Sequence, residues 1–135
     1  MKKIDFILLV DDDILCNFLN ERIISKIAKQ STIKKLYDGK QALEYFLSIF
    51  RENRTDELPE LVFLDINMPE MDGFEFLKKF QQIDNPRKAF VKIYILTSSD
   101  SSIDKEESKK YPIAGYIVKP LTIEKLESIV QGISR

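Results

Sequence analysis

Residues 6–27 read FILLVDDDILCNFLNERIISKI, and this stretch decides the fold. Its first five residues are all apolar, as in a strand that is buried on both faces of a parallel sheet. The apolar residues that follow recur at helical spacing, at Leu15, Phe18, Leu19, Ile23 and Ile27. A buried strand that leads directly into an amphipathic helix is the repeating unit of an α/β fold.

The same alternation continues along the rest of the chain. Short apolar runs predict four more strands, at residues 32–36, 61–64, 91–96 and 116–118. Longer runs predict four more helices, at residues 42–50, 74–80, 102–111 and 123–133. A charged connector covers residues 51–60. Five strands alternating with five helices indicate one α/β domain over residues 1–135, with a parallel sheet covered on both faces.

Length and composition agree with a single domain. The chain has 135 residues, of which 44% are hydrophobic and 32% charged, enough for a core with a solvated surface. The formal net charge of -1 gives no overall attraction to nucleic acid or to a membrane. No apolar run approaches the roughly 20 residues of a membrane span, and the first residues lack a signal-peptide pattern. We expect a cytoplasmic protein.

Histidine is absent, and Cys16 is the only cysteine. These two facts exclude Ser-His-Asp catalysis, zinc sites built from histidine or cysteine, and a phosphohistidine acceptor. A single cysteine forms no internal disulfide and fits a reducing compartment. Because Cys16 lies in an apolar helical stretch, we expect it to be a small buried residue. Any chemistry therefore uses carboxylates, hydroxyls, lysines and backbone groups.

Polar residues follow four of the five predicted strands. They are Asp11-Asp12-Asp13, Asp65, Thr97-Ser98-Ser99 and Lys119-Pro120. Taken alone, each has a structural alternative: acids and hydroxyls cap helices, with Asp13 and either Ser101 or Ser102 as candidates, an aspartate forms a turn, and a lysine lies at the surface. Because ligands of parallel α/β sheets bind beyond the carboxyl ends of the strands, these residues also form the candidate site.

Taken together, the four segments are more specific. If the first and third strands are neighbours, about 4.8 Å apart, Asp11, Asp12 and Asp65 meet in one pocket. Two like charges about 4 Å apart repel by roughly 4 kcal/mol at an effective dielectric constant near 20, so the cluster needs positive charge. Lys119 supplies one unit, and Mg²⁺ is the cation that oxygen ligands favour. Such a pocket suits phosphoryl transfer, with Asp65 as nucleophile and Thr97 donating its hydroxyl to a phosphoryl oxygen.

Four motifs carry a resemblance to a known family: LVDDD at 9–13, LDINMPEMDG at 64–73, LTS at 96–98 and GYIVKPL at 115–121. With these motifs in this order, the chain resembles the receiver domains of bacterial two-component response regulators, including the free-standing CheY-like type. The resemblance extends over residues 7–133. It implies a flavodoxin-like, doubly wound (βα)5 fold with strand order 2-1-3-4-5, and a single receiver domain over residues 1–135 with no output domain.

The resemblance also implies roles for individual residues. Asp65 is the expected phosphoacceptor, with Lys119 and Thr97 contacting the phosphoryl group. The expected Mg²⁺ ligands are Asp11, Asp12, Asp65 and the backbone carbonyl of Asn67, with Asp12 binding directly and Asp11 either directly or through water. Tyr116 is expected to rotate on phosphorylation, and the Lys119-Pro120 bond is expected to be cis. The positions that tune the dephosphorylation rate in the family are occupied by Asn67 and Ser99.

As a receiver, the chain would accept a phosphoryl group from a sensor histidine kinase or a histidine phosphotransfer protein. Phosphorylation would switch a protein-binding face made of the fourth helix, fifth strand and fifth helix. We expect the polar fourth helix, at residues 102–110, to be loosely packed and to shift. The domain would promote its own phosphorylation and dephosphorylation without being a turnover enzyme. We expect a monomer or weak dimer whose target is a protein rather than nucleic acid or a membrane.

Three other functions suit a similar fold. A magnesium-dependent phosphatase with an aspartyl-phosphate intermediate typically carries a second acid two residues after the nucleophile, where this chain has Asn67. A nucleotide- or flavin-binding module needs a phosphate-cradling loop after the first strand, where the acidic residues 11–13 repel phosphate. A DNA-binding regulator needs a helix-turn-helix or a basic stripe, and the sequence shows neither.

Overall fold

A five-stranded parallel sheet forms the centre of the molecule in the computed structural model, which describes residues 4–133. The strand order is β2-β1-β3-β4-β5, which confirms the expected doubly wound fold. Each strand falls within one residue of its predicted position. The strands are β1 (Phe6–Val10), β2 (Thr32–Leu36), β3 (Leu61–Leu64), β4 (Lys92–Thr97) and β5 (Gly115–Val118).

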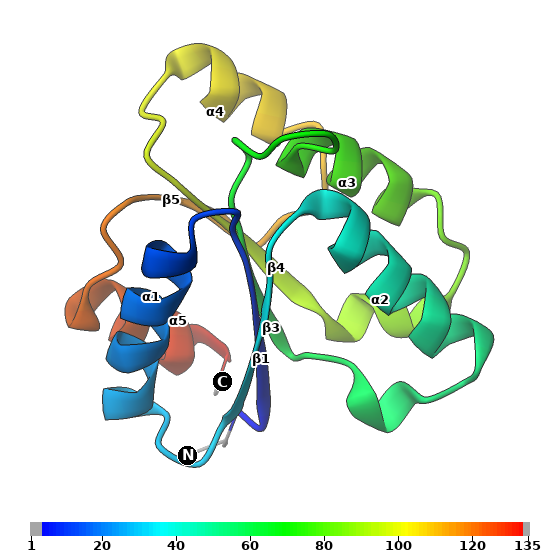
Figure 1. The fold of residues 1–135 in the computed structure, drawn as a ribbon, viewed down its shortest axis with the longest axis horizontal. Helices are drawn as coiled ribbons and strands as arrows, with labels where there is room; N and C mark the ends of the chain where they lie inside the picture. The colour runs from blue at the N-terminus through cyan, green and yellow to red at the C-terminus, as the bar shows by residue number, and fades with distance from the viewer. Residues whose placement is uncertain (1–3, 134–135) are drawn as a thin grey trace.

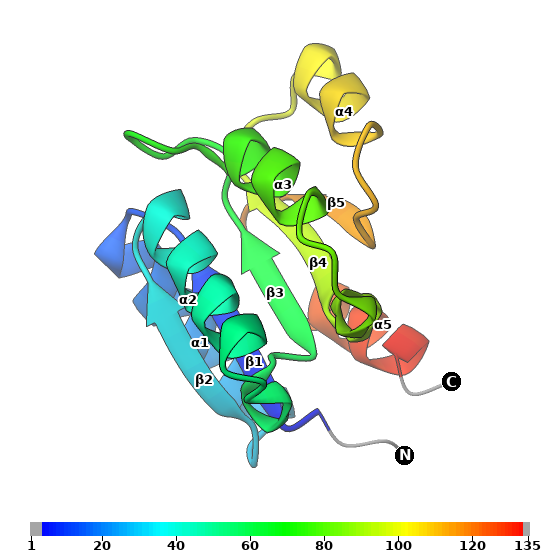
Figure 2. The ribbon, with the colours of Figure 1, turned by 90° about the vertical axis from the view of Figure 1, so that its right-hand side faces the viewer.

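Helices cover both faces of this sheet (Figures 1 and 2). They are α1 (Ile14–Ile27), α2 (Gly39–Arg51), α3 (Gly73–Gln81), α4 (Ser102–Ser108) and α5 (Ile123–Ile133). Helices α1 and α5 lie on one face, and α2 and α3 lie on the other. The charged connector contains a short 3-10 turn, Thr55–Glu57, and a second turn that the sequence reading missed spans Pro86–Phe90.

The strand residues alternate between two apolar cores. Ile7 and Leu9 of β1 face the core under α1 and α5, whereas Leu8 and Val10 face the core under α2 and α3. All four are at most 1% exposed. Burial on both faces explains why β1 is a continuous apolar run. The central strands are thereby fixed in place, and their carboxyl ends are rigid supports for polar side chains.

Side-chain caps begin the helices that leave the carboxyl edge of the sheet. The Asp13 carboxylate accepts hydrogen bonds from the backbone N–H groups of Leu15 and Cys16, so the predicted capping role of Asp13 is confirmed. Ser101, one of two predicted candidates, caps α4. These caps satisfy N–H groups that a helix leaves without intrahelical partners.

Helix α1 does not bury the face that its apolar spacing predicts. Leu15, Phe18 and Leu19 are 61%, 47% and 48% exposed. The buried residues of the helix are Asn17, Asn20 and Ile24. The predicted helix itself is confirmed, and Ile23 and Ile27 pack against the core. Because apolar residues occur around most of this helix, their spacing alone does not select the buried face.

Helix α4 stands apart from the sheet at one end of the molecule (Figures 1 and 2). Its only buried residue is Ser108, and Ile103 is 79% exposed. The neighbouring edge strand β5 has no fully buried residue. This arrangement agrees with the expected loose packing of the fourth helix. No helix within residues 4–133 is long and apolar enough to cross a membrane.

Candidate metal and phosphoacceptor site

The ends of β1 and β3 place Asp11 and Asp65 beside each other. The parallel ladder continues one residue beyond both strands, because the Asp65 N–H donates to the Val10 carbonyl at 2.9 Å. On the other side, the Asp11 N–H donates to the Leu36 carbonyl at 3.1 Å. The two aspartates are 4% and 6% exposed. Their backbones are therefore held by the sheet itself.

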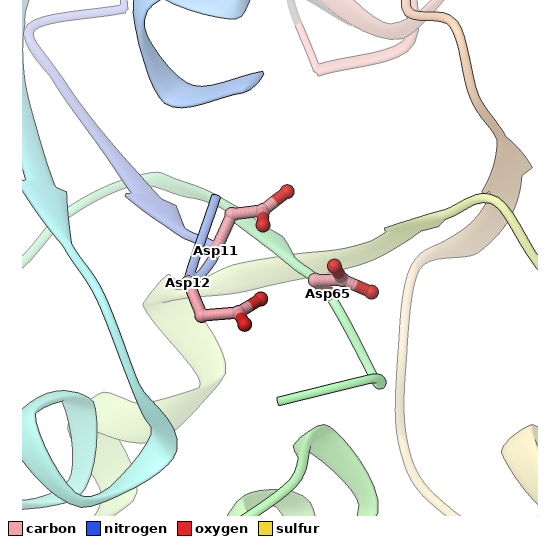
Figure 3. A group of neighbouring side chains, drawn as sticks. All are labelled: Asp11, Asp12 and Asp65. Atoms are coloured by element: carbon pink, nitrogen blue, oxygen red, sulfur yellow. The ribbon is translucent and has the colours of Figure 1, made fainter. Parts of the chain in front are cut away.

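Three carboxylates meet at this edge of the sheet. Asp11, Asp12 and Asp65 each offer an oxygen within 4.8 Å of the others. Figure 3 shows their side chains reaching the same region from the ends of β1 and β3. Asp12 is exposed, whereas the other two are buried. The structure thus brings together the three acids that the sequence singled out.

Lys119 reaches the cluster from the segment that follows β5. Its Nζ lies 2.6 Å from Oδ2 of Asp11 and 3.3 Å from Oδ2 of Asp65. Only 18% of the Lys119 side chain is exposed. The Lys119-Pro120 peptide bond is cis, as expected. One ammonium therefore contacts both buried carboxylates.

The electrostatics of the cluster favour further positive charge. Burial raises the pKa of Asp11 above its ordinary value of 3.8, and this effect outweighs the hydrogen bond from Lys119, which lowers it. Burial alone would lower the pKa of Lys119, but the hydrogen bond to Asp11 and the charge of Asp65 raise it above its ordinary value. Lys119 therefore stays protonated, while the ionised form of Asp11 is costly without a cation.

The loop after Asp65 is held by close packing against the start of α3. Gly73 donates its N–H to the Ile66 carbonyl at 3.1 Å. A Cβ at position 73 would lie 2.6 Å from the Asp65 carbonyl oxygen and 2.7 Å from the Cα of Ile66. Only glycine permits this approach. The Asn67 N–H donates to Oδ1 of Asp65 at 3.0 Å and orients the carboxylate.

Thr97 lies at the end of β4 and is fully buried. Its hydroxyl oxygen accepts hydrogen bonds from Nδ2 of Asn67 at 3.3 Å and from the Ser99 N–H at 3.2 Å. The Tyr116 hydroxyl donates to the Ser99 carbonyl at 2.9 Å. The Ser99 hydroxyl bonds to Asp104 of α4 at 2.5 Å. A hydrogen-bonded chain therefore runs from the loop after Asp65 to α4.

Two residues of α1 contribute to the site in ways that the sequence reading missed. Cys16 is only partly buried, contrary to expectation, and its sulfur lies 3.8 Å from Nζ of Lys119. It lies in the first turn of α1, where it adjoins Lys119 at the carboxyl edge of the sheet instead of the apolar core. Asn17 is 1% exposed and donates from Nδ2 to the carbonyls of Asp11 and Leu36. A polar residue within an apolar helical run was the available signal for Asn17.

The donor set fits a hard divalent cation. It consists of carboxylate oxygens, which Mg²⁺ and Mn²⁺ accept, and contains no thiolate or imidazole. Three carboxylates and one ammonium leave two uncompensated negative charges when all are ionised, since 3 − 1 = 2. Asp12, with its exposed side chain, leaves the cluster open to solvent on one side. A divalent cation would balance this charge.

Comparisons with known proteins agree with this geometry. The family model described as "Response regulator receiver domain" matches residues 7–131. The probable methanogenesis regulatory protein FilR2 of Methanothrix harundinacea is 32% identical over 127 residues, covering 94% of this chain and 79% of that protein. The response regulator Rcp1 of Synechocystis sp. is 32% identical over 131 residues, covering 94% of this chain and 84% of Rcp1.

Solved structures show the same fold. A two-component response regulator from Cytophaga hutchinsonii superposes with a TM-score of 0.86 at 29% identity, covering 98% of both chains. The Mn²⁺-bound form of Rcp1 superposes with a TM-score of 0.66 at 30% identity, covering 96% of this chain and 91% of that one. The chain therefore belongs to the response regulator receiver domains, the phosphoaccepting modules of two-component phosphorelays.

Proposed function

We propose that this chain is a single receiver domain in which Asp65 accepts a phosphoryl group in the presence of Mg²⁺. The observation that carries the proposal is the contact of one buried ammonium, Lys119, with the carboxylates of both Asp11 and Asp65. It makes Asp65 a carboxylate held beside fixed positive charge. We also propose that the protein works in the cytoplasm, because a lone cysteine fits a reducing compartment.

The proposed cation ligands are Asp11, Asp12, Asp65 and the backbone carbonyl of Asn67. Bound there, Mg²⁺ would neutralise charge on the phosphoryl oxygens. Carboxylates within 4.8 Å support this set, as does the Mn²⁺-bound form of the relative Rcp1. Mg²⁺ suits one or two carboxylates together with a phosphoryl oxygen, because it keeps near-octahedral geometry and several waters.

The proposed reaction transfers a phosphoryl group from a phosphohistidine. An Asp65 carboxylate oxygen attacks phosphorus, an O–P bond forms, and the N–P bond breaks with its electron pair left on the donor imidazole. Lys119 and the Thr97 hydroxyl stabilise the phosphoryl oxygens, because positioning and charge neutralisation dominate such transfers. Hydrolysis by water later returns Asp65 and inorganic phosphate. The domain thereby promotes its own phosphorylation and dephosphorylation and is not a turnover enzyme.

The donor is proposed to be a sensor histidine kinase or a histidine phosphotransfer protein, and its docking surface is proposed to lie on α1. Four residues on the first turns of this helix are exposed and apolar: Ile14, Leu15, Phe18 and Leu19, at 72%, 61%, 47% and 48%. The helix starts directly after Asp12 and Asp13, so a donor that reaches Asp65 passes over this surface. Contiguous exposed apolar residues are typical of protein interaction sites.

The proposed output is a change in the face made of α4, β5 and α5. The Thr97 hydroxyl would lose the hydrogen bond that it accepts from Asn67 and would donate one to a phosphoryl oxygen instead. Ser99, which donates to Asp104 and accepts from Tyr116, would carry the change to α4. A loosely packed helix is an element that such a local change can shift. This face would then bind or release its target protein. We propose that the domain itself is a monomer or weak dimer.

The test is phosphorylation by acetyl phosphate, read by intact mass. Wild-type protein should gain one phosphoryl group with Mg²⁺ and none when the metal is chelated. Asp65→Asn should gain none under either condition. Metal-independent labelling, or labelling of Asp65→Asn equal to wild type, would contradict the proposal.

A further inference from the structure

We propose that Asn17 is a positioning residue for the cation site, holding the peptide bond between Asp11 and Asp12 and thereby the carboxylate of Asp12. The inference rests on the proposed function, because it concerns the same cation. Asn17 belongs to none of the motifs that identify the family, and it contacts the cation site only through the backbone.

The Asn17 side chain joins three elements at the carboxyl edge of the sheet. Its Nδ2 donates to the Asp11 carbonyl at 3.1 Å and to the Leu36 carbonyl at 3.2 Å. The Leu36 carbonyl also accepts from the Asp11 N–H at 3.1 Å. Asn17 is itself fixed, since it lies in the first turns of α1 and is 1% exposed. One buried amide thus ties α1 to the ends of both β1 and β2.

Asp12 depends on this amide more than Asp11 does. The Asp11 carboxylate is anchored directly, by the Asp13 N–H at 2.9 Å and by Lys119 at 2.6 Å. The Asp12 carboxylate is exposed and accepts no hydrogen bond from residues 4–133. Its position is set by its backbone. The Asp11 carbonyl lies in the same rigid peptide plane as the Asp12 N–H, so the bond from Asn17 fixes the plane from which Asp12 projects.

The other end of the Asn17 amide shows that the residue does not serve stability alone. Its Oδ1 is buried without a hydrogen-bond partner among the described residues. Asn17 lines a narrow gap together with Asp11, Asn20 and Asp65. A buried acceptor without a donor destabilises a fold. What the amide contributes is therefore its two donated hydrogen bonds.

The variant Asn17→Leu separates positioning from stability. It removes the unpartnered Oδ1, while the Asp11 carbonyl loses its donor, so the number of unpartnered buried acceptors stays the same. The melting temperature should therefore change little. The dissociation constant for Mg²⁺, measured by calorimetry on the unphosphorylated protein, should rise by roughly 10–100-fold, as it does when residues that orient metal ligands are replaced.

Two controls make the measurement specific. Asn20 lies on the same helix, lines the same gap, is 8% exposed and makes no hydrogen bond to the strand ends, so Asn20→Leu should keep the wild-type dissociation constant. Leu126 of α5 is fully buried away from the site, so Leu126→Ala should lower stability without changing Mg²⁺ binding. If Asn17→Leu does not fold, the smaller Asn17→Ala, which also lacks a side-chain donor, carries the same test.

The outcomes distinguish this inference from the proposed function. Wild-type protein that binds no Mg²⁺ would overturn the proposed function itself. Wild-type binding with an unchanged constant in Asn17→Leu would overturn the positioning role alone. Equal weakening in Asn17→Leu, Asn20→Leu and Leu126→Ala would also overturn it, because it would show a general effect of destabilisation.

Discussion

Helices α1 and α2 lie on opposite faces of the same sheet and use their apolar residues in opposite ways. Helix α2 buries Ala42, Phe46 and Ile49 against the core. Helix α1 buries two asparagines, Asn17 and Asn20, beside Ile24, and leaves four large apolar side chains in solvent. On the inner side of α1, Asn17 donates to carbonyls at the ends of β1 and β2, and the apolar outer side of the first turns starts beside the acids. Helix α2 therefore serves mainly packing, and α1 serves the site.

The largest expected effect is loss of an α2 anchor. Phe46 is fully buried, and its ring centroid lies 5.0 Å from that of Phe80 and 6.0 Å from that of Phe76. Phe46→Ala should lower the free energy of unfolding by about 3–5 kcal/mol, through lost burial and the cavity left behind. Urea denaturation followed by circular dichroism measures this. A change no larger than that of Phe18→Ala on α1 would contradict the contrast between the two helices.

Close packing at the start of α3 should matter next. Gly73→Ala places a Cβ 2.6 Å from the Asp65 carbonyl oxygen, so the loop after Asp65 must shift. A displacement of this size should slow phosphorylation by acetyl phosphate by about 100-fold. Gly132→Ala is the matched control, because nothing lies within 4 Å of its Cβ. The Gly132 variant should keep the wild-type rate, and equal rates in both variants would exclude the packing effect.

A smaller effect is expected for a variant on α1 that weakens docking of the donor protein without changing the phosphorylation of Asp65 itself. Phe18→Ser should slow transfer from a histidine phosphotransfer protein that phosphorylates the wild type by about tenfold, or 1.4 kcal/mol, as for an interface anchor. Phosphorylation by acetyl phosphate should not change, because this small donor does not use the exposed surface of α1. Ile103→Ser on α4 removes an even more exposed apolar side chain, at 79% against 47% for Phe18, on a different helix and should leave both rates unchanged. Loss of both rates in Phe18→Ser would contradict a docking role.

The smallest effect should appear in the pH dependence of Mg²⁺ binding. Burial raises the pKa of Asp11 above its ordinary value of 3.8, so protons compete with the cation at a higher pH than at an ordinary aspartate. The increase in melting temperature caused by Mg²⁺ should therefore be full at neutral pH and shrink as the pH falls through the raised pKa. Without metal the sign reverses: a raised pKa stabilises the folded state below it, and this contribution is lost as the pH rises. Thermal melts with and without Mg²⁺, recorded from neutral pH down to about pH 4, measure both pH trends.

The sequence predicted those elements whose local pattern of apolar and polar residues is compatible with only one structure. The run Phe6–Val10 is apolar throughout because both faces of β1 are buried, and the acids after it mark the carboxyl edge. The meeting of Asp11, Asp12 and Asp65 followed from neighbouring parallel strands. The orientation of α1 could not be predicted in this way, because its buried side combines Ile24 with Asn17, whose hydrogen-bond acceptors are carbonyls of two strands.

The same limit explains why the role of Asn17 was missed. Spacing along a helix predicts a face only when apolar residues are confined to one side. In α1 the need to satisfy buried carbonyls at the strand ends decides which side faces the sheet. These carbonyls belong to Asp11 and Leu36, which are separated from Asn17 by 6 and 19 positions in the sequence. A pattern within the helix therefore does not reveal them.

Mapping the modified residue tests the central claim most directly. Protein phosphorylated by acetyl phosphate with Mg²⁺ can be reduced with borohydride, which converts an aspartyl phosphate into homoserine, and then digested and sequenced by mass spectrometry. The change should appear at Asp65 alone, beside unmodified Asp11 and Asp12. Homoserine at position 11 or 12, or phosphate retained elsewhere with Asp65 unchanged, would contradict a pocket arranged around one acceptor.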